Sequence, residues 1–165
     1  MRHLLRRAAV TGVTLAAALG VASPALAASD KVAGTLSIED VGSSPILSWS
    51  WGLSNSGTIG SGSGGAGAGK VNLQDFSLTK RINPLSTELV SSAALGTHFP
   101  EAVVSVPIGG PLSPFAIEYT LHPVFVSSVS QSGSGAQTTE SVSLSYGAFE
   151  QTIGNSSQFS WANGG

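Results

Sequence analysis

The sequence contains no cysteine among its 165 residues. This absence excludes disulfide bonds, zinc sites built on thiolates and thiol nucleophiles. Many small secreted domains depend on disulfides for their stability. A chain without them must be stabilised by the packing of its core or by association.

Charge is also scarce, because Asp, Glu, Lys and Arg make up only 10% of the residues. Downstream of Ala27, nine acidic residues stand against four basic ones, so that this part has a formal net charge of −5. Affinity for nucleic acid depends on Lys and Arg side chains that neutralise phosphates. The composition therefore argues against a nucleic-acid partner, and it indicates either a disordered tail or a surface that contacts partners.

The first 27 residues have the pattern of a secretory signal peptide. Three arginines precede or flank an apolar run at residues 8–21, and Ala25-Leu26-Ala27 follows as a small-x-small cleavage sequence. The run is shorter than the roughly 20 residues of a transmembrane helix, and no later run is long enough. We expect cleavage after Ala27, a secreted mature chain and no membrane association. Arg6-Arg7 leaves the general and the twin-arginine export routes both open.

The rest of the chain is expected to form one domain at residues 28–150, followed by a polar tail at residues 151–165. We expect this tail to be loose. Its aromatic residues Phe159 and Trp161 could nevertheless pack back onto the domain.

The clearest pattern in the domain lies at residues 46–54, where Leu47, Trp49, Trp51 and Leu53 alternate with serines and a glycine. This alternation predicts a half-buried strand. Each aromatic side chain buries about 150–250 Å², so Trp49 and Trp51 are expected to anchor the core, together with Phe76 in a strand at residues 71–79. A change of phase near residues 74–75 indicates a β-bulge in that strand.

Further strands are predicted at residues 31–38, 102–107, 115–122, 124–129 and 139–149. Pro123 has no backbone N–H to donate, so we expect a sheet edge or a bulge there. A Gly/Ser loop is expected at residues 131–137.

One helix is predicted at residues 86–95, between two groups of strands. Ser86 is the expected N-cap, with Asn83 followed by Pro84 as the alternative. Leu85, Leu89, Val90 and Ala93 form its apolar stripe, and Gly96 follows its last residue. The resulting fold class is mainly β: an antiparallel barrel of two packed sheets, or a sandwich, with one short flanking helix.

A glycine-rich run without periodicity occupies residues 55–69, between the tryptophan-containing strand and the next one. Residues 64–70 match G-x-x-x-x-G-K, the start of a phosphate-binding loop. That motif continues with Ser or Thr and opens a helix, whereas Val71 follows here and begins a predicted strand. We therefore reject nucleotide binding.

Groups that could perform catalysis are few and scattered. His98 and His122 each stand without a second metal ligand at close spacing. Asp75 and Glu101 could be paired for glycoside cleavage only if the fold placed them about 5–9 Å apart. The serines form no G-x-S-x-G motif. The sequence predicts no enzyme, no metal site and no cofactor.

Several motifs occur in an order that resembles one known family. SWSWG precedes the glycine-rich run, GKVNLQDFSLTK and a short helix follow it, and GTHFPEA and VFVSSVSQSGSG come later. Across about residues 36–149 the chain resembles the haemolysin-coregulated protein (Hcp) family, which forms the tube of type VI secretion. The resemblance implies a β-barrel with a flanking helix, a homohexameric ring, rings that stack into a hollow tube, and no catalytic residues.

The resemblance also assigns a role to the glycine-rich segment, which in the family is an extended loop at the contact between rings. Carried over to this sequence, the contact loop is residues 56–69. Its expected contact residues are Ser56, Gly57, Thr58, Ile59, Gly60, Gly64, Gly67 and Gly69.

Three hypotheses follow. The first is an exported, self-associating structural protein that resembles the tube subunit, with effector or spike proteins as possible further partners. The alternative is an exported module of the same fold that binds or carries effectors outside the cell. A secreted hydrolase on a β scaffold is the third.

Overall fold

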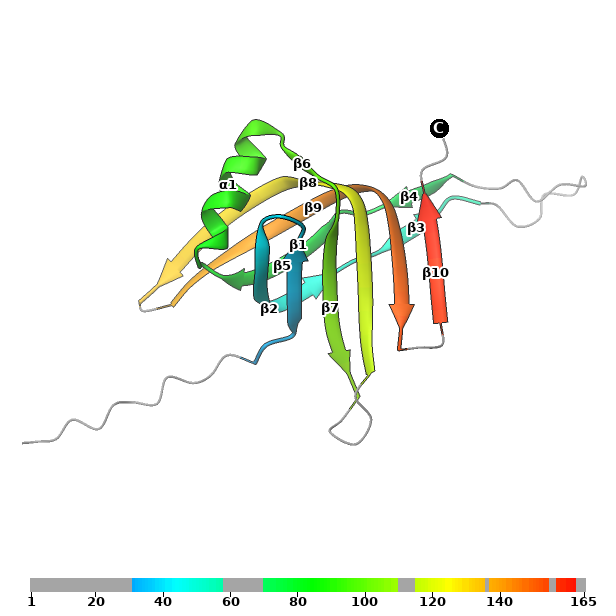
Figure 1. Cartoon of the computed structure of the whole chain (residues 1–165), viewed down its shortest axis with the longest axis horizontal. Coiled ribbons are helices and arrows are strands. Elements are labelled where there is room, and N and C mark those ends of the chain that lie inside the picture. The colour runs from blue at the N-terminus through cyan, green and yellow to red at the C-terminus, as the bar shows by residue number, and fades with distance from the viewer. Residues whose placement is uncertain (1–30, 58–69, 110–114, 136, 155–156, 163–165) are drawn as a thin grey trace, which may run out of the picture.

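The computed structural model describes residues 31–57, 70–109, 115–135, 137–154 and 157–162. Within these ranges the chain forms a barrel of strands, one helix outside it and a two-stranded ribbon that projects from it (Figure 1). The elements in chain order are β1 (Gly34–Ile38), β2 (Gly42–Ser50), β3 (Leu53–Asn55), β4 (Val71–Leu73), β5 (Phe76–Arg81), α1 (Leu85–Leu95), β6 (His98–Phe99), β7 (Ala102–Ile108), β8 (Phe115–Ser134), β9 (Gln137–Ile153) and β10 (Ser157–Ala162).

The barrel closes through antiparallel pairs. β5 pairs with β2, β2 with β1, and β1 with β7. β7 then pairs with the first part of β8, and β9 pairs with both β8 and β5, which completes the circle. The predicted fold class, a mainly β antiparallel barrel with one flanking helix, is confirmed.

β8 and β9 form one long hairpin. The two strands predicted at residues 115–122 and 124–129 are a single strand that continues to Ser134, so the Gly/Ser loop expected at residues 131–137 is mostly strand. The outer edge of β8 pairs with β7 as far as Leu121 and with β6 from Val124. Pro123 lies between these two pairings, at the point where the neighbouring strand changes from β7 to β6. The missing N–H of a proline is tolerated at such a place. The register shift itself lies later, between Val126 and Ser128.

The strand predicted at residues 46–54 is divided into β2 and β3, which are separated by Trp51 and Gly52. β2 has a register shift between Ile46 and Ser48. Because of this shift, Ile46 and Trp49 both contact the core. Leu53 was expected on the buried face but is 44% exposed, since β3 pairs with β4 in a separate sheet.

The strand predicted at residues 71–79 is likewise divided. β4 ends at Leu73, β5 begins at Phe76, and the two belong to different sheets. The change of phase near Gln74 and Asp75 is therefore a break between two strands, not a bulge within one strand.

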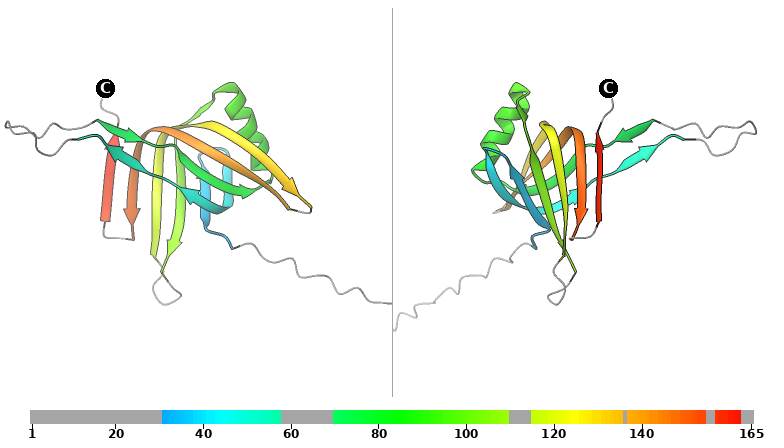
Figure 2. Two further views of the ribbon diagram at one scale, coloured as in Figure 1. Left: turned by 180° about the vertical axis from the view of Figure 1, so that it is seen from behind. Right: turned by 45° about the vertical axis from the view of Figure 1, so that its right-hand side comes forward.

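α1 lies against the outside of the barrel, on the flank opposite the ribbon (Figure 2). Gly96 ends the helix in the left-handed conformation, with φ of 66°, as the sequence predicts. The expected apolar stripe is partly wrong, because Val90 is 43% exposed while Ser86 and Ser92 are buried with Leu89. Ser86 lies inside the first turn and makes no cap, since Pro84 occupies the N-cap position.

The prediction of a loose tail at residues 151–165 is wrong for the central part of this segment. β9 extends to Ile153, and β10 pairs with it through residues 157–162. The ring centroids of Phe159 and Trp161 lie 5.8 and 6.5 Å from that of Phe149. The tail is thus a further strand beside the barrel wall, held by main-chain pairing and aromatic contacts.

The outward face of four neighbouring strands carries almost only hydroxyl side chains. One row across β2, β5, β9 and β8 is Ser50, Ser77, Ser143 and Ser128, as the strand registers show. The next row is Ser48, Thr79, Ser141 and Ser130. We call this surface the hydroxyl face.

Candidate functional site

The ribbon of β3 and β4 ends where the predicted contact loop begins, and we call this ribbon the arm. Three residue pairs connect its strands, from Leu53 with Leu73 to Asn55 with Val71. Val71 begins a strand, as expected, and not the helix that a phosphate loop requires. The arm extends away from the barrel in both views of Figure 2.

Of the predicted contact residues, the structure describes two. The Ser56 Oγ donates to the backbone oxygen of Lys70 at 3.4 Å, and the Gly57 N–H donates to Asn55 Oδ1 at 2.9 Å. The Ser56 bond joins the two sides of the arm, whereas the Gly57 bond is a local turn on the β3 side. The other predicted residues lie outside the described ranges; they are Thr58, Ile59, Gly60, Gly64, Gly67 and Gly69.

The three predicted core anchors lie in one aromatic cluster near the arm. Phe76 is fully buried, and Trp49 and Trp51 are half-buried against the core. Tyr119 joins all three, with ring centroids 5.4 Å from Trp49, 5.4 Å from Trp51 and 5.2 Å from Phe76. Trp51 also meets Phe149 edge-on at 4.8 Å. Tyr119 and Phe149 complete a cluster that the sequence reasoning identified only in part.

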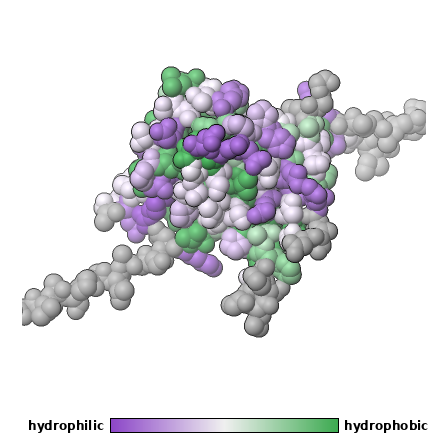
Figure 3. All heavy atoms as spheres, in the orientation of Figure 1, coloured by the Kyte–Doolittle hydropathy of each residue, from purple (hydrophilic) through white to green (hydrophobic). Residues whose placement is uncertain are grey.

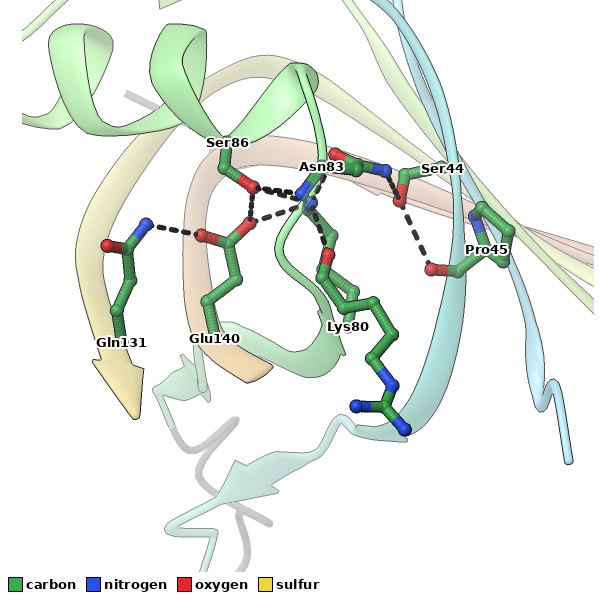
Figure 4. A network of polar contacts seen from close by, with 8 residues as sticks. Ser44, Pro45, Lys80, Asn83, Ser86, Gln131 and Glu140 are labelled. Atoms are coloured by element: carbon green, nitrogen blue, oxygen red, sulfur yellow. Dashed lines mark hydrogen bonds and ion pairs between the residues drawn. The ribbon is translucent and has the colours of Figure 1, made fainter. Parts of the chain in front are cut away.

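A buried ion pair lies at the opposite end of β5, beneath the start of α1 (Figure 4). Lys80 Nζ lies 2.7 Å from Glu140 Oε1, and both side chains are inaccessible to solvent. Lys80 also donates to the backbone oxygen of Arg81 and to Asn83 Oδ1. Lys80 comes from β5 and Glu140 from β9, so the pair joins two neighbouring strands of the barrel.

Ser86 connects this pair to the helix. Its hydroxyl accepts from Lys80 Nζ at 3.1 Å and from the Asn83 N–H at 3.0 Å, and it donates to Glu140 Oε1 at 2.7 Å. Gln131 donates to Glu140 Oε2 at 3.0 Å. Among the described residues, no buried side-chain polar atom lacks a partner. The network therefore satisfies a charge pair that would otherwise be costly to bury.

The protonation state of the pair follows from these contacts. Burial raises the pKa of the Glu140 carboxyl, but hydrogen bonds from Lys80, Ser86 and Gln131 and the charge of Lys80 outweigh it. The net result is a pKa below the ordinary value. Glu140 is therefore ionised at neutral pH, and the network is a structural tie and not a proton donor.

The sequence reasoning did not identify this network, although one signal was available. Lys80 continues the alternation of Phe76 and Leu78, and Glu140 precedes Val142 in the same phase. Alternation alone would have placed both charged side chains inside the barrel.

The candidate catalytic groups lie on different elements or connections of the fold. His98 lies on β6, where its ring packs 5.1 Å from that of Phe125, while His122 lies on β8. Asp75 accepts a hydrogen bond from Ser127, and the backbone oxygen of Glu101 accepts from the Glu39 N–H. The described part of the chain contains no group of three or more His, Cys, Asp or Glu side chains arranged to hold a metal ion. None of its helices is long and apolar enough to cross a membrane.

Comparison with known proteins gives one consistent family. The sequence model of the family described as "Type VI secretion system effector, Hcp" matches residues 30–153. Protein hcp1 of Pseudomonas aeruginosa is 43% identical over 82 residues, which are 47% of this chain and 49% of that protein. The match thus spans about half the length of this curated relative.

Solved structures share the fold. Hcp1 from Salmonella typhimurium has a TM-score of 0.62 at 24% identity, over 79% of this chain and 93% of that one. A type VI secretion system effector from Yersinia pestis has a TM-score of 0.62 at 14% identity, over 78% and 98%. At these identities the likeness shows the fold alone.

Proposed function

The chain belongs to the Hcp family of type VI secretion, and from this premise we propose that it is a structural subunit that associates with copies of itself. In this proposal, six copies form a ring and rings stack into a hollow tube. The observation that carries the proposal is the family match at residues 30–153, which includes every strand from β1 to β9. In this proposal the subunit has no catalytic role.

The surface of the barrel supports self-association. A ring joins subunits head to tail, so one patch of each subunit contacts a different patch of the next. Large apolar side chains are exposed on α1, where Leu95 is 77% and Val90 43% exposed, and on β10, where Phe159 is 53% exposed. α1 and β10 lie on opposite flanks of the barrel (Figure 1), and apolar residues reach the surface between polar ones (Figure 3).

The arm supports a second kind of contact. It projects beyond the barrel and carries the exposed side chain of Leu53. In the proposal, the loop at residues 56–69 extends this arm to a neighbouring ring.

The test of the proposal is the mass of the assembled protein. Native mass spectrometry and sedimentation velocity of residues 28–165 are expected to show a six-fold assembly, and electron microscopy is expected to show rings and stacks. A strictly monomeric protein at high concentration would contradict the proposal.

We further propose that residues 1–27 are a cleaved leader and that the mature chain is secreted. The leader pattern of the sequence supports this. The intact mass of the protein recovered from culture medium should correspond to a chain that begins at Ala28. An unprocessed chain retained inside the cells would contradict the cleavage.

The same leader favours a second candidate function, an exported module of this fold that binds or carries effector proteins without being part of a tube. A monomer that captures an effector or spike protein would support this candidate against the ring. The hydrolase hypothesis predicts instead that alanine at His98, His122 or Asp75 abolishes a measured hydrolysis.

A further inference from the structure

Two short connections join the arm to the barrel, and the described strands of the arm do not pair with those of the barrel. Trp51 and Gly52 connect β2 to β3, and Gln74 and Asp75 connect β4 to β5. Within the described ranges, β3 and β4 pair only with each other. Main-chain hydrogen bonds of the sheets therefore do not set the direction of the arm, and side-chain contacts at its base must do so.

Both connections meet at one hydroxyl group of the barrel wall. The Trp51 indole Nε1–H donates to the Tyr146 hydroxyl at 2.5 Å. The same hydroxyl donates to the backbone oxygen of Gln74 at 2.9 Å. A phenol has one proton to donate, and here it accepts from one side of the arm and donates to the other.

The barrel holds Tyr146 in place. Tyr146 lies in β9, half-buried, and its ring meets Phe149 edge-on at 6.2 Å. Phe149 is 1% exposed and contacts Trp51 as well. The hydroxyl is thus presented from the main aromatic cluster, so that a displacement of the arm would break contacts to the core.

Two further contacts restrain the same region. The Gln74 N–H donates to the backbone oxygen of Gly52 at 3.1 Å, which joins the two connections to each other. Ser127 donates to Asp75 Oδ2 at 2.5 Å, from the register shift of β8 between Val126 and Ser128. A β-bulge redirects the side chain at its position, and here the redirected side chain reaches the base of the arm.

We propose that Tyr146 is a positioning residue whose hydroxyl fixes the direction of the arm for contact with a second copy of this chain. The contact with a second copy rests on the proposed function, whereas the fixing of the arm does not. Burial raises the pKa of Tyr146, the Trp51 hydrogen bond lowers it and repulsion by Asp75 raises it, with a net increase. The hydroxyl therefore keeps its proton, and its bond to Gln74, at neutral and mildly alkaline pH.

The test is Tyr146→Phe in the full chain, which removes the hydroxyl and keeps the ring. Hydrogen exchange followed by mass spectrometry is expected to show amides of residues 53–55 and 71–75 exchanging about tenfold faster, because two hydrogen bonds are lost. Amides of β1 and β7, which lie away from the arm, should be unchanged. The assembled fraction in sedimentation velocity should fall.

Tyr119→Phe is the matched control. It removes a buried hydroxyl that accepts from Gln151 at 3.3 Å and keeps the ring in the same aromatic cluster. Exchange in the arm should then stay as in the unmodified chain. Trp51→Phe removes the indole donor together with part of the ring and leaves the Tyr146 bond to Gln74 in place. It should also speed exchange in the arm, and it provides a second measurement if Tyr146→Phe does not fold.

The outcomes separate the two proposals. Unchanged exchange in the arm of Tyr146→Phe or, failing that, of Trp51→Phe overturns the positioning role, whatever the assembly does. Faster exchange with undiminished assembly overturns the link to the second copy. If the unmodified chain is monomeric, the proposed function fails, while the exchange comparison still decides whether Tyr146 fixes the arm.

Discussion

At the scale of single residues, the most consequential interaction is the ion pair of Lys80 and Glu140. Taking two charges out of water is costly, and the cost is offset only when the pair is close and its other hydrogen bonds are satisfied. Ser86, Asn83 and Gln131 meet that condition here. The pair ties β5 to β9, and through Ser86 it fixes the start of α1.

Glu140→Ala should therefore be strongly destabilising, because it leaves the Lys80 ammonium buried without a carboxylate. We expect the free energy of unfolding to fall by about 3–5 kcal/mol, measured by urea denaturation. Glu118→Ala, which removes an exposed acid on β8, is the control and should change it by less than about 0.5 kcal/mol. Equal losses in the two variants would argue against the ion pair as a structural tie.

The same pair predicts a dependence of stability on pH. The pKa of Glu140 is lower in the folded chain than its ordinary value of 4.5. The folded state therefore binds fewer protons than the unfolded state in this range, so stability is fully present above that value and is lost as pH falls through the folded pKa. Denaturation at a series of pH values below about 5 should show this loss, and it should be smaller in Glu140→Gln.

This network also shows where sequence reasoning ends at the residue scale. The phases of Lys80 and Glu140 can be read from their apolar neighbours, and they point both side chains inward. The order of strands in the barrel makes β5 and β9 neighbours and places Ser86 above them. The periodicity of a sequence carries no information about this order.

At the scale of elements, α1 is held by a narrow face. Leu89→Ala should lower the free energy of unfolding by about 2–5 kcal/mol, because Leu89 is fully buried between the helix and the barrel. Val90→Ala, one position along, should have an effect within about 0.5 kcal/mol, since Val90 is exposed. Thermal or urea unfolding compares the two, and a similar loss in both would contradict the observed orientation of the helix.

The contact of β1 with β7 gives a second prediction at this scale. A Cβ atom at Gly34 would lie 2.4 Å from the backbone oxygen of Ser105, so Gly34→Ala must push the two strands apart. We expect a loss of about 1–3 kcal/mol in urea denaturation. Gly133→Ala is the control, because its Cβ would meet the Thr138 side chain at 3.4 Å and the backbone oxygen of Gln137 at 3.8 Å, both ordinary contact distances. No difference between the variants would count against this close approach.

Most elements could be predicted from the sequence because strands and helices have different periods. The helix end at Gly96 and the alternation of β7 and β9 are local signals. The alternation of Phe159 and Trp161 with polar residues is only a weak signal for β10, because this strand of six residues depends on the exposed edge of a long β9. The division of β2 from β3 has a similar cause, since the sequence pattern continues across Trp51 while the sheet does not.

At the scale of the whole molecule, the barrel and the arm should respond differently to change. Deleting residues 60–67 should leave the free energy of unfolding nearly unchanged, because loop length affects it only logarithmically. In the proposed tube, the same deletion should reduce the stacking of rings, as seen by electron microscopy. Stacking as extensive as that of the unmodified chain would show that the loop does not make this contact.

The hydroxyl face has a consequence for the electrostatics of whatever meets it. Each of its side chains can either donate or accept a hydrogen bond and carries no fixed charge. These side chains can therefore all be hydrated, and they contribute no charge–charge attraction or repulsion that dissolved ions could screen. The hydroxyl side chains themselves should then add no salt-dependent contribution to contacts made across β2, β5, β8 and β9.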